Sequence, residues 1–401
     1  MAWRNLWRNK KRTFIALSSV FFAAFLCMVF GSFMEGATDY MIDTTIERQI
    51  GHFQVMNPEY KDDKIVDNFL IISQKQLNSW ESNPKISRLN PRIETFAMAW
   101  NGNKTRPIGL IGVDPRRENL FSKLEKRIRL GHYLSQKDNG IIIGKHFSQS
   151  MNLNIGDTLT LIGQGYHGAT ASGLFPIRAI MNSYDAQTDA SIAYTSISTA
   201  RDFIDLPDGA SYISVLLKDE KNINEVINEL RQDNKGNNYR FEPWEELIKN
   251  TMAGIASDKK TFALFFYILY IVVGFGLFGT VVMMTNEREK EFSVMSSLGM
   301  KKKSLIIGLF FELLIINIIG LILSIIIATP IITYFHSNPV HLTGQMARAM
   351  DEYGIEPIFP FALEIKLFFN QIIAITLMSI FTIIYPIGKL SRLSIIDTLR
   401  K

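Results

Sequence analysis

The sequence predicts an α-helical membrane protein with four transmembrane helices and a large extracytoplasmic mixed α/β domain. Four long apolar runs predict the membrane helices, one near the start and three after residue 260. A mostly polar stretch of about 220 residues separates the first run from the second, and it alternates strand-like and helix-like patterns. An apolar run of about 18 or more residues without charge is long enough to cross a bilayer as a helix.

The first apolar run, Phe14–Met34, follows a strongly basic start. It is longer than the apolar region of a signal peptide, which is about 7–15 residues, and residues 33–37 make a poor cleavage site. We therefore expect an uncleaved transmembrane helix. The other three runs are Thr261–Thr285, Ser304–Tyr334 and Leu367–Gly388.

Positive residues predict the orientation of these helices. Arg and Lys collect before the first helix, in the short loop 286–303, and after the fourth helix, whereas the loop 336–366 carries more acidic than basic residues. By the positive-inside rule both termini and loop 286–303 are cytoplasmic. The predicted domains are residues 1–36 (cytoplasmic N-terminus and first membrane helix), 37–257 (external α/β domain with stalk helices) and 258–401 (three membrane helices).

Composition excludes several functions. The net charge of +5 is modest and many basic residues sit beside membrane runs, so we expect topology-setting charge and no nucleic-acid partner. The one cysteine, Cys27, excludes an intrachain disulfide. No metal-ligand spacing, phosphate-loop motif or nucleophile elbow occurs. We expect no enzyme activity, no catalytic or metal-binding residue, and no cofactor bound by this chain.

The polar stretch is predicted to alternate strands and helices, as mixed α/β domains do. Pro243 suits a helix start, because the missing N–H would be unpaired there anyway. The expected strands are 50–56, 95–100, 107–113, 141–143, 158–162, 177–181, 191–194 and 211–217, and the expected helices are 115–128, 145–151, 198–204, 223–232 and 243–256.

A glycine-rich segment, residues 163–173, lies between two of these expected strands. It has two interpretations: a hairpin tip, which is the ordinary structure for such a segment, or a protruding loop that docks a partner.

The loop after the second membrane run contains a short amphipathic helix pattern. Phe292, Met295 and Leu298 recur at i, i+3 and i+6, and Gly299 is a typical helix stop. Such a helix outside the bilayer is suited to enter a groove on a soluble partner. The alternative is a helix that rests on lipid headgroups.

Several segments together resemble the FtsX/MacB-type ABC transporter permeases. Residues 287–300, with 310–312, are similar to that family's coupling segment. Residues 4–13 resemble its N-terminal start, 144–161 its periplasmic-domain signature, and 386–400 its C-terminal end. Within the family, residues 49–63 are most similar to the lipoprotein-releasing (Lol) permeases. The 163–175 loop departs from that subfamily, since it lacks the basic, Met/Pro-containing stretch of a carrier-docking hook.

The resemblance implies a MacB-type periplasmic domain in an inner-membrane protein. Two permease chains, identical or related, would pair and engage a cytoplasmic ATPase dimer, which binds ATP and Mg. ATP-driven motion would enter through a coupling helix at 287–299 and expel a lipoprotein toward a periplasmic carrier. The implied coupling residues are Glu287, Arg288, Glu289, Glu291, Phe292, Met295, Leu298, Gly299 and Met300.

The resemblance also implies a cavity for acyl chains, bordered by membrane lipids, between the first and second helices of the two chains. Apolar side chains there suit acyl groups, because each buried CH₂ contributes about 0.8 kcal/mol. The predicted lining is Phe25, Met28, Val29, Phe33, Phe262, Phe265, Phe266 and Leu269. Glu312 lies within the third membrane helix, where an ionisable group needs a partner, and Arg288 or Lys290 are the expected partners.

Three functions remain open on the sequence. The first is lipoprotein extraction powered by a partner ATPase. The second is efflux of a peptide or small molecule through a tripartite pump. The third is a permease that moves no substrate and activates a periplasmic hydrolase.

Overall fold

The computed structural model describes residues 10–182, 186–234, 238–287, 289–298, 300–345, 347, 357–382 and 384–391. Contacts divide the chain into two compact units. The membrane-helix unit comprises residues 1–40, 253–340 and 358–401, and the α/β unit comprises residues 41–252 and 341–357. Each is described by itself.

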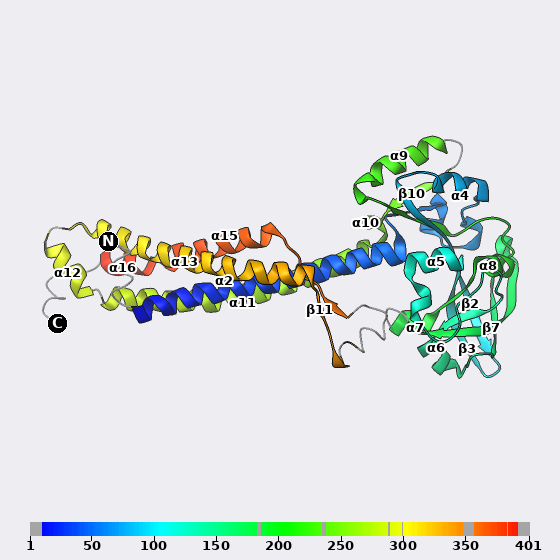
Figure 1. Ribbon diagram of the computed structural model, residues 1–401, viewed down its shortest axis with the longest axis horizontal. Coiled ribbons are helices and arrows are strands. Elements are labelled where there is room, and N and C mark those ends of the chain that lie inside the picture. The colour runs from blue at the N-terminus through cyan, green and yellow to red at the C-terminus, as the bar shows by residue number, and fades with distance from the viewer. Residues whose placement is uncertain are drawn as a thin grey trace. The chain divides into compact units, whose positions relative to one another are not determined.

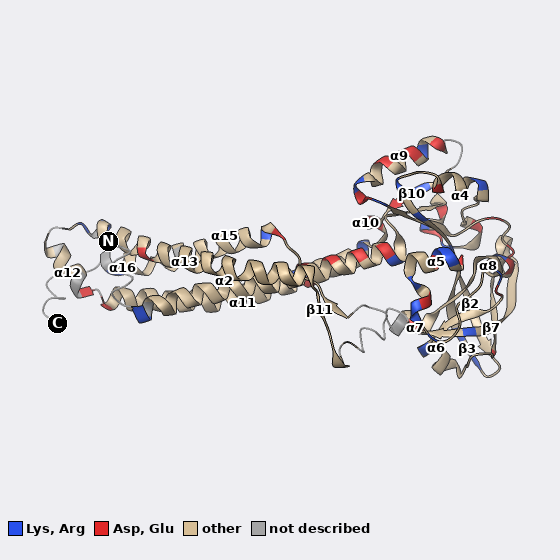
Figure 2. Ribbon diagram, viewed as in Figure 1, with Lys and Arg blue, Asp and Glu red and all other residues tan. Residues whose placement is uncertain are grey.

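In the described part of the chain, four helices are long and apolar enough to cross a membrane. They are α2 (Lys10–Thr45), α11 (Lys249–Glu287), α13 (Lys302–Ser337) and α15 (Ile365–Thr382) (Figure 1). Charged residues are sparse along α11, α13 and α15 and frequent on the α/β unit (Figure 2). Two short helices complete the described part of this unit, α12 (Glu289–Ser297) and α16 (Ile384–Ser391).

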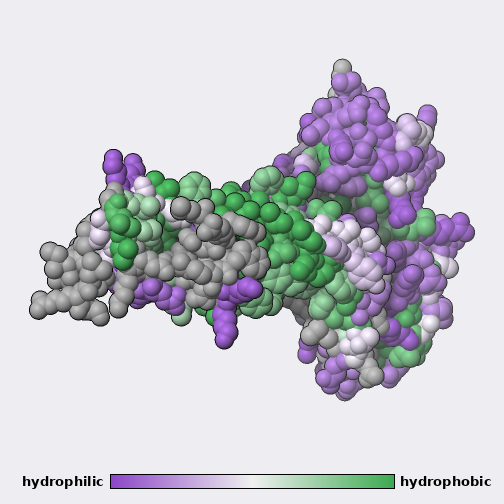
Figure 3. Space-filling model, turned by 60° about the vertical axis from the view of Figure 1, so that its left-hand side comes forward, coloured by the Kyte–Doolittle hydropathy of each residue, from purple (hydrophilic) through white to green (hydrophobic). Residues whose placement is uncertain are grey.

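The four long helices pack around one apolar cluster to which each contributes. Gly320 of α13 allows a close approach to α2, because a Cβ there would lie 2.8 Å from Val20 Cγ1. Small residues bring membrane helices together in this way. The surface of the unit is strongly hydrophobic (Figure 3). The cluster consists of Val20, Ala24, Met28, Leu277, Leu321, Ala328, Ile332 and Ile375.

The α/β unit is built on a ten-stranded mixed sheet. Its order is β10-β1-β9-β2-β3-β8-β5-β7-β4, and β6 pairs with β2 and β7. The strands are β1 (Phe53–Met56), β2 (Ile86–Asn101), β3 (Lys104–Val113), β4 (Ile128–Gly131), β5 (Ile141–Gly144), β6 (Thr158–Gln164), β7 (Thr170–Met181), β8 (Ile192–Ser196), β9 (Tyr212–Leu217) and β10 (Arg240–Pro243). A separate pair joins β11 (Val340–His341) and β12 (Ile358–Phe359).

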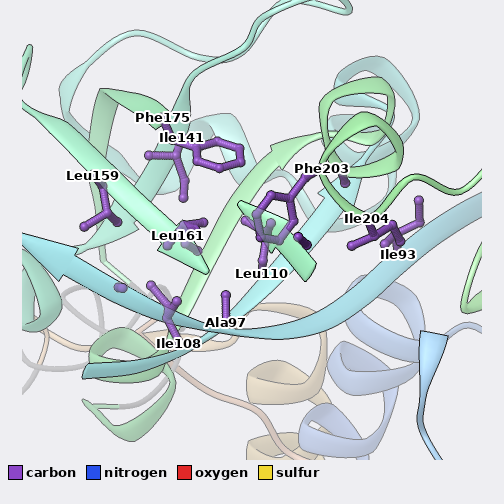
Figure 4. Close-up of a cluster of buried hydrophobic side chains, with 14 of the residues drawn as sticks. Ile93, Ala97, Ile108, Leu110, Ile141, Leu159, Leu161, Phe175, Phe203 and Ile204 are labelled. Carbon is purple, nitrogen blue, oxygen red and sulfur yellow. The ribbon is translucent and has the colours of Figure 1, made fainter. Parts of the chain in front are cut away.

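Two large apolar clusters form the core of this unit. One gathers side chains from β2, β3, β5, β6 and β7 under α6 (Lys145–Met151) and α8 (Ile197–Ile204) (Figure 4). The other packs β1 and β9 against α4 (Gln74–Glu81) and α9 (Ile223–Asp233). The amphipathic pattern of α9 explains its placement, since Ile223, Val226, Ile227 and Leu230 are all buried.

Most predicted elements of the domain form, but several boundaries differ. The helix expected over 115–128 ends earlier, because α5 (Pro115–Ser122) stops at Lys123 in the left-handed conformation and the chain becomes β4 from Ile128. The helix expected from Pro243 is also wrong at its start: Pro243 ends β10, and a four-residue helix, α10 (Trp244–Leu247), precedes α11. The shorter elements are α3 (Pro58–Asp62), α7 (Ala186–Ser191), η1 (Ile46–Ile50), η2 (Val66–Asn68), η3 (Leu124–Arg127), η4 (Tyr166–Gly168) and η5 (Glu220–Asn222).

A buried ion pair fixes the end of η1 to the sheet. Arg92 of β2 binds both carboxylate oxygens of Glu118 on α5, at 2.8 and 2.9 Å, and also donates to the Gln49 carbonyl. Asn90 donates to Glu118 at 2.6 Å. Burial by itself would raise the pKa of Glu118, but the Arg92 charge and these hydrogen bonds lower it below its ordinary value.

Gly51 completes this attachment of η1. It has φ +79°, and a Cβ there would lie 2.7 Å from the Val215 carbonyl oxygen. No other residue fits that close approach without strain. The π-turn of η1, a conformation often found at functional sites, is therefore held in one position on β9 and β2.

Candidate coupling and substrate surfaces

The short helix α12 is attached to its own membrane helices through a buried cluster. Phe292 is 5% exposed and packs with Val281 and Met284 of α11, and Met295 lies partly buried against the same cluster. From α13 the cluster takes Leu305, Leu309 and Leu313. Two apolar side chains of α12, Phe292 and Met295, are thus packed against helices of the same chain.

The predicted apolar face of this helix is divided in the structure. Phe292 and Met295 point inward, whereas Leu298 is 82% exposed. The reason is that α12 ends at Ser297, where the Met300 N–H bonds to the Met295 carbonyl at 3.0 Å, so Leu298 lies past the last helical residue. The Phe292 side chain is therefore directed into its own chain in this conformation, and its part in ATPase coupling stays a prediction. The exposed apolar side chains are Val294, Leu298 and Met300.

Lys389 of α16 joins the start of α12 to the C-terminal helix. Its ammonium group lies 3.0 Å from Glu289 Oε2 and also donates to the Asn286 side chain. Glu287 is exposed at the end of α11. Of the other predicted coupling residues, Arg288, Gly299 and the side chain of Glu291 lie outside the described part of the chain.

Glu312 is fully buried in α13, next to Leu313 of the α12 cluster. Its predicted partners, Arg288 and the side chain of Lys290, lie outside the described residues, so that pairing stays a prediction. Burial of a carboxyl group within a membrane helix costs free energy unless the group is paired or hydrogen-bonded.

The predicted acyl-chain lining is only partly exposed. Met28 has no exposed surface and belongs to the central four-helix cluster, and its place in a cavity between two chains stays a prediction. Phe25 and Val29 pack partly buried against the same cluster. Phe265, in contrast, is 60% exposed on α11. The side chains of Phe33, Phe262, Phe266 and Leu269 are half-buried.

Two aromatic side chains that the sequence analysis did not single out, Phe359 and Phe361, lie against Phe33 of α2. The ring centroid of Phe33 lies 4.9 Å from that of Phe359 and 5.8 Å from that of Phe361. Ser32 bonds to Ala362 through its hydroxyl and its carbonyl, at 2.6 and 2.9 Å. The segment that enters α15 is therefore attached to α2. Only Phe359 and Phe361, on either side of Pro360, could have signalled this contact.

The glycine-rich segment forms a tight hairpin. β6 reaches Gln164 and β7 already begins at Thr170, so the strand starts seven residues before the predicted position. The His167 N–H bonds to Asp67 Oδ1 at 2.5 Å, which attaches the tip to η2. Among the two interpretations, this geometry favours the hairpin tip. Whether it docks a partner remains a prediction.

Comparisons with known proteins agree with this architecture. Residues 13–233 match the family model of the MacB-like periplasmic core domain, and residues 263–395 match that of the FtsX-like permease C-terminal region. The chain is 19% identical over 324 residues to the lipoprotein-releasing system transmembrane protein LolE of Haemophilus influenzae, covering 78% of this chain and 77% of that one. It is 24% identical over 242 residues to an uncharacterized ABC transporter permease of Mycobacterium tuberculosis, covering 59% of this chain and 27% of that protein.

Solved structures of related external domains overlap only loosely. The periplasmic region of MacB from Actinobacillus actinomycetemcomitans matches with a TM-score of 0.36 and 13% identity, over 50% of this chain and 92% of that one. The extracellular domain of the transporter YknZ from Gram-positive bacteria gives 0.35 and 12%, over 47% and 98%. The two family models together cover residues of both units. These residues include the described apolar helices of the membrane-helix unit and the mixed sheet of the α/β unit. The chain belongs to the ABC transporter permease family whose members combine a MacB-like periplasmic core domain with an FtsX-like C-terminal region.

Proposed function

We propose that this chain is the permease subunit of an ABC transporter that extracts lipoproteins from the inner membrane toward a periplasmic carrier. A separate cytoplasmic ATPase dimer would bind ATP and Mg and supply the work. The observation that carries this proposal is the attachment of α12 to α11 and α13 through the Phe292 cluster.

A rigid attachment is what a coupling helix needs. Close-packed apolar clusters transmit displacement instead of absorbing it. A push on α12 would therefore move the ends of α11 and α13 together, because Phe292 shares one buried cluster with Val281 of α11 and Leu305 of α13. Leu298 and Val294, which remain exposed beside this cluster, are the side chains proposed to contact the ATPase. Lys389 would carry the same motion to α16.

The orientation of the termini is part of the proposal. Lys and Arg beside the membrane helices favour cytoplasmic termini and a cytoplasmic α12. The same orientation leaves residues 37–257 in the periplasm, the compartment named for the family's core domain. The absence of an ATPase motif in this chain supports an energy source on another subunit.

The exposed surface of α11 supports an apolar cargo and a second permease chain. Only 6% of the most apolar stretch of α11 is buried, whereas 39% of the corresponding stretch of α2 is buried. Phe265 and Ile268 are more than half exposed, and each CH₂ of an acyl chain buried against them would contribute about 0.8 kcal/mol. The similarity to a lipoprotein-releasing protein supports a lipid-modified cargo.

Site-specific photo-crosslinking tests the cargo. A photo-reactive residue at Phe265 of the full chain in native membranes should capture a lipoprotein, whereas the same residue at Met28, which is fully buried, should capture at least tenfold less. Identification of the adducts by mass spectrometry distinguishes the outcomes. Phospholipid alone at Phe265, or equal lipoprotein capture at both positions, would contradict lipoprotein extraction.

A further inference from the structure

A hollow lies on the sheet of the α/β unit, over the neighbouring strands β2, β3 and β8. Its volume is about 400 Å³. Binding sites for small molecules measure about 300–1,000 Å³, so the hollow is large enough for a small ligand. Its lining includes Glu94, Phe96, Gly109, Ile111 and Ile192.

The strand register explains why the sheet is hollow here. Phe96 of β2, Gly109 of β3 and Ile192 of β8 lie in one row across the sheet. Gly109 has no side chain, so this row is low in its middle. Side chains alternate between the two sides of a strand, and the neighbours Ile108 and Leu110 point into the core on the other side (Figure 4). The hollow is therefore the place of one missing side chain in an apolar row.

Glu94 brings a negative charge to this apolar hollow. It lies opposite Ile111, one row along the same side of the sheet. Its Oε1 atom accepts a hydrogen bond from the Tyr212 hydroxyl. Burial and the charge of Glu94 raise the pKa of Tyr212, so this hydroxyl keeps its proton and remains a donor. The fold thus holds the carboxylate at the wall of the hollow.

This carboxylate makes no ion pair with any residue that the structure describes. The Tyr212 hydroxyl is its one hydrogen-bond partner among those residues, and no described Lys, Arg or His lines the hollow. An ionised carboxylate offers about four acceptor sites on its two oxygens. Glu94 therefore keeps acceptor sites for a ligand.

The chemistry of the lining suits an organic cation. An ammonium group forms a charge-assisted hydrogen bond with a carboxylate, and it is also attracted to the face of an aromatic ring. Phe96 offers such a ring, since its side chain is 74% exposed beside the hollow. The floor at Gly109 and the side chains of Ile111 and Ile192 offer apolar contact to the rest of the ligand.

The charge of Glu94 disfavours other occupants. An anion would be repelled by it. A neutral apolar molecule, or an apolar protein surface, would displace water from the carboxylate without replacing its hydrogen bonds, which costs free energy. A metal ion needs several oxygen ligands, and Glu94 is the only carboxylate among the described residues that line the hollow.

We propose that this hollow binds a small organic cation with an apolar body and one ammonium group. The ammonium group pairs with Glu94, and the apolar body lies over Gly109 between Phe96 and Ile192. None of these residues belongs to the proposed cargo surface of α11 or to the proposed ATPase contact. The inference therefore does not rest on lipoprotein extraction, and its failure would leave that proposal untouched.

Three matched probes test the charge preference. Phenethylammonium, the neutral phenethyl alcohol and the anionic hydrocinnamate share one aromatic body and differ in the polar group. Each is titrated against the full chain in detergent micelles, and binding is followed by saturation-transfer NMR. We expect a dissociation constant of about 1 mM or below for phenethylammonium and at least tenfold weaker binding of the other two. Equal binding of the alcohol, stronger binding of the anion, or no saturable binding of phenethylammonium overturns the proposal.

Two substitutions show whether the binding occurs in the hollow. Glu94→Gln removes the charge but keeps an acceptor for the Tyr212 hydroxyl. Gly109→Val fills the floor, and its Cβ would lie 3.6 Å from the nearest atom, the Ser191 carbonyl oxygen, which is an ordinary contact. Both variants should bind phenethylammonium at least tenfold more weakly. Glu94→Gln should leave the binding of phenethyl alcohol unchanged.

The matched control is Thr105→Val, an exposed position of β3 outside the hollow. It should bind phenethylammonium as the unmodified chain does, and all variants in the same micelles share any partition of the probe into detergent. Thermal unfolding of each variant confirms that it is folded, and Glu94→Gln decides the outcome if Gly109→Val is not. Unchanged phenethylammonium binding by a folded Glu94→Gln or Gly109→Val variant, or an equal loss in Thr105→Val, overturns the proposal.

Discussion

The two units of this protein expose apolar side chains for different reasons. In the membrane-helix unit, Phe265 and Ile271 are about 60% exposed on a helix suited to cross a bilayer, where lipid, the proposed cargo or a second permease chain would cover them. In the α/β unit, Phe96 and Leu174 are at least as exposed on a sheet whose other side is a complete core. The same exposed fraction is therefore expected where a helix faces an apolar phase, and it is unusual where a sheet faces water.

The units also treat charge differently. The α/β unit buries a complete ion pair, Arg92 with Glu118, and satisfies it with additional hydrogen bonds. The described ion pairs of the membrane-helix unit are partly exposed, as Lys389 with Glu289 illustrates. We expect the first kind to control folding of its unit and the second to have little effect on stability.

Removing one partner of the buried pair should give the largest effect. Glu118→Gln leaves the Arg92 guanidinium buried without its counter-charge, and such changes cost about 3–5 kcal/mol. Denaturant unfolding of the full chain, followed by tryptophan fluorescence, measures it, since Trp80 and Trp244 report on this unit. The matched control is Arg92→Met with Glu118→Leu, which should be close to neutral. If Glu118→Gln lowered the free energy of unfolding by less than about 1 kcal/mol, the buried pair would contribute no more than an exposed pair does.

The same pair predicts a specific acid sensitivity. The pKa of Glu118 is lowered in the folded state from its ordinary value of 4.5. Its contribution is therefore fully present above pH 4.5 and is lost as the pH falls through the lowered folded pKa. Between pH 7 and pH 5 this group should not change the stability, and below that range wild type should lose stability more steeply than Glu118→Gln. Parallel curves for the two proteins under acid conditions would contradict the assignment.

The exposed pair should give the smallest effect. Lys389→Gln removes the contact with Glu289, and partly exposed pairs contribute only about 0–1 kcal/mol. We expect unchanged unfolding of the helices, with weaker ATPase stimulation because α16 is no longer joined to α12. A large loss of stability would mean that this contact has a structural role like that of Arg92.

The sequence predicted the parts of the fold that depend on local pattern. The four apolar runs became helices, and strands such as 141–143 and 158–162 formed where β-branched residues cluster. β2 was placed only from Thr95, although it begins at Ile86, because Pro91 and the polar residues around it argue against a strand. Tertiary pairing with β9 overrides that local preference.

The sequence located the amphipathic helix after the second membrane run, but it did not predict where the side chains of that helix point. The pattern of Phe292, Met295 and Leu298 located an amphipathic segment, yet it could not reveal that the first two residues pack on α11 and α13. Likewise, Met28 has the residue type of a lipid-facing side chain, and only helix packing determines that it is buried. Hydropathy does not distinguish a protein core from lipid in a membrane helix.

We propose that work from an ATPase enters this chain through α12, and the variant Leu298→Asp tests this proposal. Leu298→Asp places a charge on the exposed side chain beside the Phe292 cluster without changing that cluster. The control is Ile155→Asp, which alters a 42% exposed apolar residue of the α/β unit. Co-purification with the partner ATPase and the stimulated rate of ATP hydrolysis are measured together. We expect Leu298→Asp to reduce both at least tenfold with unfolding unchanged, and the control to retain them. A Leu298→Asp permease that still binds and fully stimulates the ATPase would show that α12 is not the coupling helix.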